Sequence, residues 1–139
     1  MDAFARVRRI GLMLPGVEAA TRYDGSPRLL LGGCFVAGLA THASAEPDTL
    51  VVRADPDERA LLLEDAPETY YVTDYYRKYP VVLVRLAAID NAALRDVLTV
   101  SRRLTLPKTR RHGGSGRRGA GLVPAGERRL RKRVGPADQ

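Results

Sequence analysis

The sequence predicts an α+β domain in which N- and C-terminal helices cover one face of an antiparallel sheet, followed by a basic tail. Three observations favour this two-layer fold. Helix-like periodicity occurs near both ends of the first 107 residues, tight turns rather than regular crossover helices join the strand-like runs between them, and the apolar pattern stops at Pro107. With 139 residues, 45% of them hydrophobic, the chain has material for one core.

The first helix is expected over residues 2–14, ending at Pro15-Gly16. Its apolar side chains recur every three or four residues and therefore fall on one stripe: Phe4, Val7, Ile10 and Leu14. The arginines between them lie off that stripe. This segment should therefore pack with its apolar side on the sheet.

The next segments predict strands. A short polar strand is expected at residues 19–23, before the turn residues Asp24-Gly25-Ser26-Pro27. Two apolar runs, 28–31 and 34–41, are separated only by Gly32-Gly33. A Gly-Gly link accepts the positive φ angles of a two-residue hairpin turn, so these two runs should pair antiparallel.

The second half of the domain is expected to hold a strand at 49–53, a short helix at 56–64, a buried β-branched strand at 81–86 and a last helix at 91–104. Asp55 can cap the second helix, and Pro56 suits its first position. Residues 70–78 are expected to form a polar, aromatic connection.

Charge divides the chain at Pro107. Residues 1–107 hold 13 basic and 14 acidic residues, whereas 108–139 hold 10 basic residues against Glu127 and Asp138, which together give the 23 and 16 of the whole chain. The net charges are −1 and +8. The tail has too few apolar side chains to offset its ordering entropy. We therefore expect a folded domain at 1–107 and a disordered Arg/Gly-rich tail at 108–139.

Neither a catalytic nor a metal site is visible in the sequence, and no cofactor is expected. His42 and His112 have no partners at metal-ligand spacing. The Gly114–Gly119 segment fits the G-x-G-x-x-G pattern but has no strand before it and no helix after it, as a dinucleotide site requires. No apolar run approaches the roughly 18 residues of a membrane span. The sequence thus predicts a cytoplasmic, non-enzymatic protein with no membrane partner.

Five of the six tyrosines lie within residues 70–79, beside Arg77 and Lys78. Tyrosine rings next to cations can stack on bases, but at a loop-to-strand junction they can also pack on the core edge with wet hydroxyls. The candidate nucleic-acid contacts are Tyr75, Tyr76, Arg77 and Lys78 in the domain and Arg110, Arg111, Arg117, Arg118, Arg128, Arg129, Arg131, Lys132 and Arg133 in the tail.

Many short pieces match one known family in order. They are Leu14-Pro15-Gly16-Val17-Glu18, Asp24-Gly25-Ser26-Pro27, Phe35-Val36-Ala37-Gly38-Leu39, Leu50-Val51-Val52-Arg53, the block from Pro67 to Leu86, and Leu106-Pro107-Lys108. Residues 3–108 in this way resemble the MmcQ/YjbR-like family. The resemblance implies a two-layer α+β domain similar to type III secretion chaperones, and a family described as DNA-binding by analogy of fold. It brings no catalytic residue and no cofactor. The family often has histidine where Tyr75 stands and glycine where Lys78 stands.

Two functional hypotheses follow from the sequence. The first is a non-enzymatic, nucleic-acid-associated protein that contacts DNA without sequence specificity through its basic tail. The alternative is a protein-binding, chaperone-like adaptor that uses an exposed sheet face or edge strand, as a monomer or a homodimer, with a tail that aids solubility. Arginine outnumbers lysine 20 to 3. A tail shaped only by a GC-rich genome would show the same bias.

Overall fold

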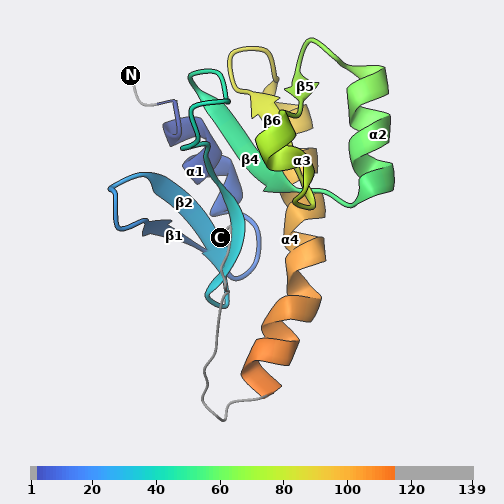
Figure 1. Ribbon diagram of the computed structural model, residues 1–139. Helices are drawn as coiled ribbons and strands as arrows, with labels where there is room; N and C mark the ends of the chain where they lie inside the picture. The colour runs from blue at the N-terminus through green and yellow to red at the C-terminus, as the bar shows by residue number, and fades with distance from the viewer. Residues whose placement is uncertain (1–2, 115–139) are drawn as a thin grey trace. The chain divides into compact units, whose positions relative to one another are not determined.

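The computed structural model describes residues 3–114, which form six strands and four helices (Figure 1). Their bounds are α1 Ala5–Gly11, β1 Val17–Thr21, β2 Pro27–Leu31, β3 Cys34–Leu39, β4 Thr49–Arg53, α2 Pro56–Asp65, β5 Tyr70–Tyr71, α3 Asp74–Arg77, β6 Val81–Arg85 and α4 Asn91–Gly114. The six strands make one sheet in the order β1-β2-β3-β4-β6-β5, and every neighbouring pair is antiparallel. The predicted α+β class is confirmed.

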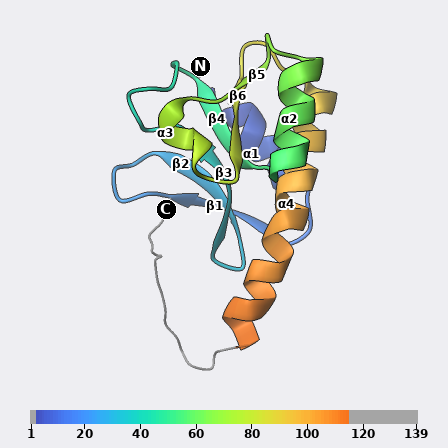
Figure 2. The same ribbon diagram turned by 45° about the vertical axis from the view of Figure 1, so that its right-hand side comes forward.

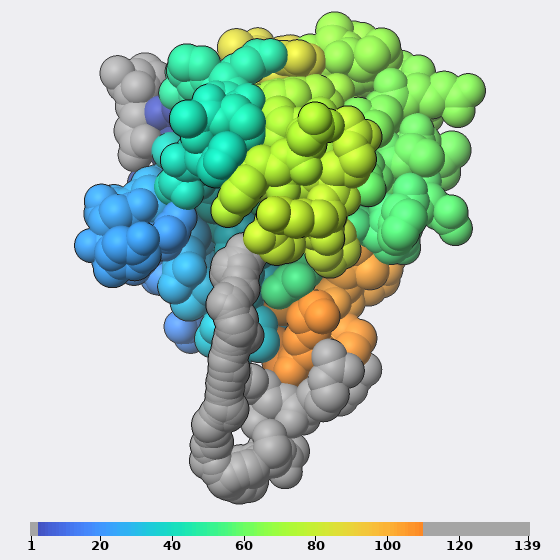
Figure 3. Space-filling view, viewed as in Figure 1, coloured from blue at the N-terminus to red at the C-terminus, as the bar shows by residue number. Residues whose placement is uncertain are grey.

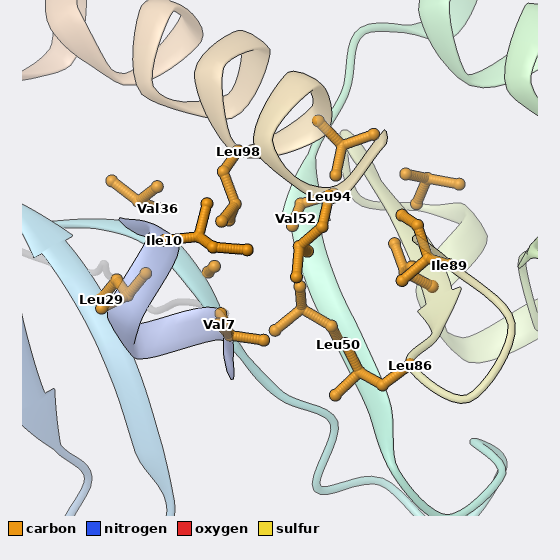
Figure 4. Close-up of a cluster of buried hydrophobic side chains, with 14 of the residues drawn as sticks. Val7, Ile10, Leu29, Val36, Leu50, Val52, Leu86, Ile89, Leu94 and Leu98 are labelled. Carbon is orange, nitrogen blue, oxygen red and sulfur yellow. The ribbon is translucent and has the colours of Figure 1, made fainter. Parts of the chain in front are cut away.

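The main core lies between the sheet and the two terminal helices. Figure 4 shows Val7 and Ile10 of α1 and Leu94 and Leu98 of α4 meeting apolar side chains of the sheet. The sheet side chains in this cluster include Leu29, Val36, Leu50, Val52, Val82 and Val84. The residues from β4 (Leu50, Val52) and from β6 (Val82, Val84) alternate along each strand, as expected when one face of a pleated strand is buried. The predicted covering of one face by the first and last helices is therefore confirmed.

A smaller cluster lies on the opposite face of the sheet. Val51 and Leu83, which alternate with the core residues of β4 and β6, contact Tyr76 of α3 there. The loop between β3 and β4 contributes Ala40 and Ala45 to the same cluster. In Figure 2, α3 and α4 lie on opposite sides of the sheet. This smaller cluster positions the candidate site.

The hairpin between β2 and β3 has the predicted turn. Leu31 pairs with Cys34, and the two residues between them have positive φ angles, 56° for Gly32 and 81° for Gly33. These angles fit the two-residue turn that matches the twist of a hairpin. Further along the hairpin the register shifts between Leu29 and Leu30. The bulge leaves Val36 and its neighbour Ala37 both fully buried.

The second helix begins as predicted. Asp55 is its N-cap, and the Asp55 carboxylate accepts a hydrogen bond from the Glu58 backbone N–H at 2.8 Å. Pro56 follows at the first helical position, where its missing N–H costs nothing. The strand predicted at 49–53 has the same bounds in the structure, and that predicted at 81–86 ends one residue earlier.

Several boundaries differ from the prediction. The first helix covers Ala5–Gly11 rather than 2–14, β1 lies at Val17–Thr21 rather than 19–23, and β3 ends at Leu39 rather than residue 41. The expected connection at 70–78 contains both β5 and α3. A two-residue strand and a one-turn helix are too short to produce a periodic pattern, so neither could be predicted from the sequence.

The last helix does not end near Leu104 but continues to Gly114, with Pro107 inside it. Proline removes a single helical hydrogen bond, to the carbonyl of the exposed Arg103, which water can hydrate. Residues 108–114, expected to be irregular, are therefore helical. The rest of the predicted tail, 115–139, lies outside the described residues. The compact unit that holds the sheet covers Met1–Leu106, and a second unit begins at Pro107.

Candidate nucleic-acid interface

The one-turn helix α3 carries three of the predicted contact residues. Thr73 caps it, because its hydroxyl oxygen accepts a hydrogen bond from the Tyr76 N–H. The turn places neighbouring tyrosines on different sides. Tyr75 is 38% exposed, whereas only 8% of Tyr76 is exposed. The short helix thus directs Tyr75 toward solvent and Tyr76 toward the protein interior.

Tyr76 is a structural residue, which corrects its assignment as a contact. Its ring packs on the sheet, and its hydroxyl oxygen accepts a hydrogen bond from the His42 backbone N–H at 3.2 Å. Burial raises the pKa of this hydroxyl above its ordinary value of 10.0, opposed by the hydrogen bond from His42. A ring held between the sheet and a loop cannot stack on a base without unfolding α3.

Tyr75 lies flat against a histidine from the loop before β4. The rings of His42 and Tyr75 are stacked with 3.6 Å between centroids and 9° between planes. The Ser44 N–H donates to Nδ1 of His42 at 3.0 Å, and the Ser44 hydroxyl is 2.9 Å from that of Thr73. These bonds fix the imidazole plane parallel to the tyrosine ring.

A cation completes this group. The Lys78 ammonium lies 5.0 Å from the ring centroid of Tyr75 and 5.6 Å from that of Tyr79, within cation–π range. His42, Tyr75 and Lys78 are exposed and Tyr79 is half-buried. We call His42, Tyr75, Lys78 and Tyr79 the Tyr75 surface. Figure 3 shows α3 and the loop before β4 side by side on the face that carries it.

Other contacts hold this surface in place. Nη1 of Arg59, on α2, donates to the backbone oxygens of Tyr79 at 3.0 Å and Val81 at 3.1 Å, which anchors the segment after α3. At the far end of the loop, Arg85 binds both carboxylate oxygens of Glu46 at 2.9 Å. The hydrogen bond from Arg85 lowers the pKa of the Glu46 carboxyl. Arg59 therefore holds the segment that carries Tyr79, and Arg85 holds the loop that carries His42.

The predicted site residues do not all lie together. Tyr75 and Lys78 meet in the Tyr75 surface, and exposed Arg77 lies beside them, with its Nη2 3.6 Å from the Asp74 carboxylate. Arg110 and Arg111 lie within α4. The remaining tail cations lie outside the described residues: Arg117, Arg118, Arg128, Arg129, Arg131, Lys132 and Arg133.

Sequence reasoning missed His42 and Arg59. His42 stands 33 positions before Tyr75, and a lone histidine at a strand end has no local pattern that announces an aromatic stack. Arg59 looks like any exposed cation of a helix. Within the part of the chain that the structure describes, no group of three or more His, Cys, Asp or Glu side chains could hold a metal ion. None of the described helices is long and apolar enough to cross a membrane.

The chain is similar to uncharacterised mycobacterial proteins. One is from Mycobacterium bovis, and two are from strains of Mycobacterium tuberculosis; each is 36% identical over 72 residues, which is 49% of this chain. The chain spans about half the length of these curated relatives, 56% in each case. No protein-family model and no solved structure matches the chain.

Proposed function

We propose that this chain is a non-enzymatic, nucleic-acid-associated protein. Its basic tail binds phosphates without sequence specificity, and its Tyr75 surface stacks against unpaired bases. The observation that carries the proposal is the separation of charge: −1 in residues 1–107 and +8 in 108–139. The resemblance to a family described as DNA-binding supports it by analogy alone.

The tail supplies affinity by releasing counterions from nucleic acid. Each phosphate that a cation neutralises adds about 0.7 to the slope of log affinity against log salt for a single strand, and about 0.9 for a duplex. Ten cations can neutralise several phosphates at once. Binding should therefore be fast, weak at physiological salt and indifferent to sequence.

The Tyr75 surface supplies a platform for bases. His42 and Tyr75 are already stacked and both are exposed, so a base can extend the stack without rearranging the loop. The Lys78 ammonium beside the rings can move to a phosphate of the bound strand. Because bases in a duplex are already stacked on one another, this contact favours single strands.

A salt titration of full-length variants tests the tail. Fluorescence anisotropy of a labelled single-stranded oligonucleotide is measured with Arg128, Arg129 and Arg131 changed to Gln, and with Arg9, Arg95 and Arg103 changed to Gln as a charge-matched control. The control arginines are exposed on α1 and α4. We expect the tail variant to lower both affinity and salt slope, the slope by about 2 if each arginine meets one phosphate. Equal effects of the two triple variants would contradict the role of the tail.

The same assay tests the surface. Tyr75→Ala should weaken single-strand binding by about 1–3 kcal/mol, roughly 5- to 150-fold, and leave the salt slope unchanged, since no charge is lost. Tyr23→Ala is the matched control, because Tyr23 is 94% exposed beside Arg22 and lies outside the Tyr75 surface. If Tyr75→Ala and Tyr23→Ala bind alike, the Tyr75 surface is not a base platform.

A further inference from the structure

Among the described residues, no strand pairs with the outer edge of β1, where the Val17 N–H alone is bonded, to the Leu14 oxygen at 3.2 Å. β1 ends the sheet and pairs only with β2. Glu18, Ala19 and Thr21 are exposed, and Ala20 is half-buried. Its pairing with β2 runs without a bulge from Val17 to Thr21. This edge is therefore regular and open to another strand.

The direction of the free backbone groups follows from one hydrogen bond. The Arg22 N–H donates to the Ser26 oxygen at 2.9 Å, so Arg22 directs its backbone groups toward β2. Direction alternates along a strand, and hence Ala20 and Glu18 also face β2. The N–H and C=O groups of Ala19 and Thr21 then point away from the sheet. These are the groups that an added strand would bind.

The strand lacks the features that usually block such pairing. Natural edge strands carry lysines, proline, bulges or inward charges. β1 reads Val17-Glu18-Ala19-Ala20-Thr21 and has one charged residue, Glu18. Small side chains at positions 19 and 20 let another backbone approach closely.

We propose that β1 pairs antiparallel with β1 of a second copy of this chain, with Ala20 opposite Ala20 of the partner subunit. In this register Ala19 lies opposite Thr21 of the partner subunit, so the outward N–H and C=O groups of both residues bind one another. Glu18 lies opposite Arg22 of the partner subunit. The two-fold symmetry repeats each contact.

Charge complementarity selects this register. Glu18 and Arg22 are four positions apart, so they lie on the same face of the sheet, and pairing about Ala20 brings the opposite charges together twice. Arg22 already donates from Nη1 to the Thr41 hydroxyl at 2.8 Å, and its Nε lies 3.9 Å from the Asp24 carboxylate. A guanidinium has five N–H donors, and it can also bind a carboxylate. Pairing about Ala19 would instead oppose Glu18 to Ala20, with no charge partner.

The dimer joins the two sheets into one and carries two tails and two Tyr75 surfaces. Both copies of α1 then lie on the same face of the joined sheet, because the two-fold axis of an antiparallel edge pair is perpendicular to it. This inference is independent of the proposed function. If nucleic acid does bind, two linked sites raise its affinity through a high effective concentration.

Sedimentation equilibrium of the full chain, without nucleic acid and from micromolar to millimolar concentration, tests the pairing. We expect the mass to rise from 15.2 kDa toward twice that value. Glu18→Arg and Arg22→Glu should each shift the chain to monomer, whereas the double variant should restore the dimer because the two charges are exchanged. Asp57→Arg, a charge reversal at an exposed position of α2, is the control and should leave the dimer unchanged.

A backbone variant checks the edge itself. Ala19→Pro removes an N–H that points away from β2, so it should abolish the dimer while the circular dichroism spectrum of the fold is retained. A monomer at every concentration would overturn the proposal. So would a dimer that persists in Ala19→Pro, or a double charge reversal that fails to restore dimerisation.

Discussion

Two adjacent tyrosines show how strongly one position changes the role of a side chain. Tyr75 is exposed and stacks on His42. Tyr76 packs on the face of the sheet away from the main core, and its hydroxyl oxygen accepts a hydrogen bond from the His42 N–H. Their sequence surroundings are nearly the same. Because the rings meet edge-on, with 5.0 Å between centroids, the buried one also supports the exposed one.

The buried Tyr76 hydroxyl should make the fold sensitive to alkali. Burial raises its pKa in the folded state above the ordinary 10.0, so the folded chain holds this proton more tightly than the unfolded chain. The resulting stability is complete below pH 10 and is lost as pH rises from there through the folded pKa. In Tyr76→Phe the unfolding free energy should fall less steeply over that range.

Urea unfolding between about pH 8 and pH 11 measures this effect. At the lower end Tyr76→Phe should be less stable by about 0.5–1.5 kcal/mol, since the His42 N–H loses its acceptor. Some alkaline loss will remain, because burial also raises the pKa of Tyr70. Tyr23→Phe, at an exposed position, should match the unaltered chain. An identical pH profile for Tyr76→Phe would refute the assignment.

At the scale of elements, α4 is joined to the sheet by buried hydroxyls as well as by apolar contact. The Ser101 hydroxyl is fully buried; it donates to the Val36 oxygen at 2.6 Å and accepts from the Arg53 N–H at 2.9 Å. One turn later the Thr105 hydroxyl lies 3.1 Å from the Phe35 oxygen. The bulged end of β3 therefore finds hydrogen-bond donors on the helix.

Ser101→Ala should destabilise the domain strongly for such a small change. It leaves the Val36 C=O and the Arg53 N–H buried without this partner, at about 1–3 kcal/mol for each group. Thr99→Ala is the control, because the exposed Thr99 hydroxyl donates only to the Arg95 oxygen of its own helix, and its loss should cost less than about 0.5 kcal/mol. If Ser101→Ala and Thr99→Ala had the same midpoint in chemical denaturation, the role of Ser101 would be contradicted.

At the scale of the molecule, one core connects the beginning and the end of the compact unit. It includes Phe4 near the N-terminus and Leu98 in α4, both fully buried. The two terminal helices therefore stabilise the same face of the sheet and should unfold with it. A domain of this size with a single main core normally melts in one step.

Leu98→Ala should lower the unfolding free energy by about 2–5 kcal/mol, because it opens a cavity where α4 meets the sheet. Leu61→Ala on α2 is the control, since Leu61 is 56% exposed and loses little contact. Circular dichroism and tyrosine fluorescence should report the same melting temperature in each variant. Two separate transitions in Leu98→Ala would mean that the terminal helices do not share one core.

Features that depend on neighbouring residues were predictable from the sequence. The Gly32-Gly33 turn, the Asp55 cap and the strand at 49–53 were predicted correctly, because positive φ angles, capping oxygens and β-branched runs act within a few positions. The layer order was also predicted, since amphipathic ends around paired strands leave few ways to bury the apolar stripes.

The contacts between polar residues depend instead on how distant segments pack. Arg6 was expected only to lie off the apolar stripe, and its position does not predict that its guanidinium donates to the backbone oxygens of Leu86 at 2.6 Å and Ile89 at 2.8 Å. His42 joined Tyr75, and Tyr76 left the candidate site, through contacts between segments far apart in the chain. Local patterns record the burial preference of a side chain, whereas its partner is set by how distant elements pack. For that reason the fold was predictable from the sequence and the composition of the Tyr75 surface was not.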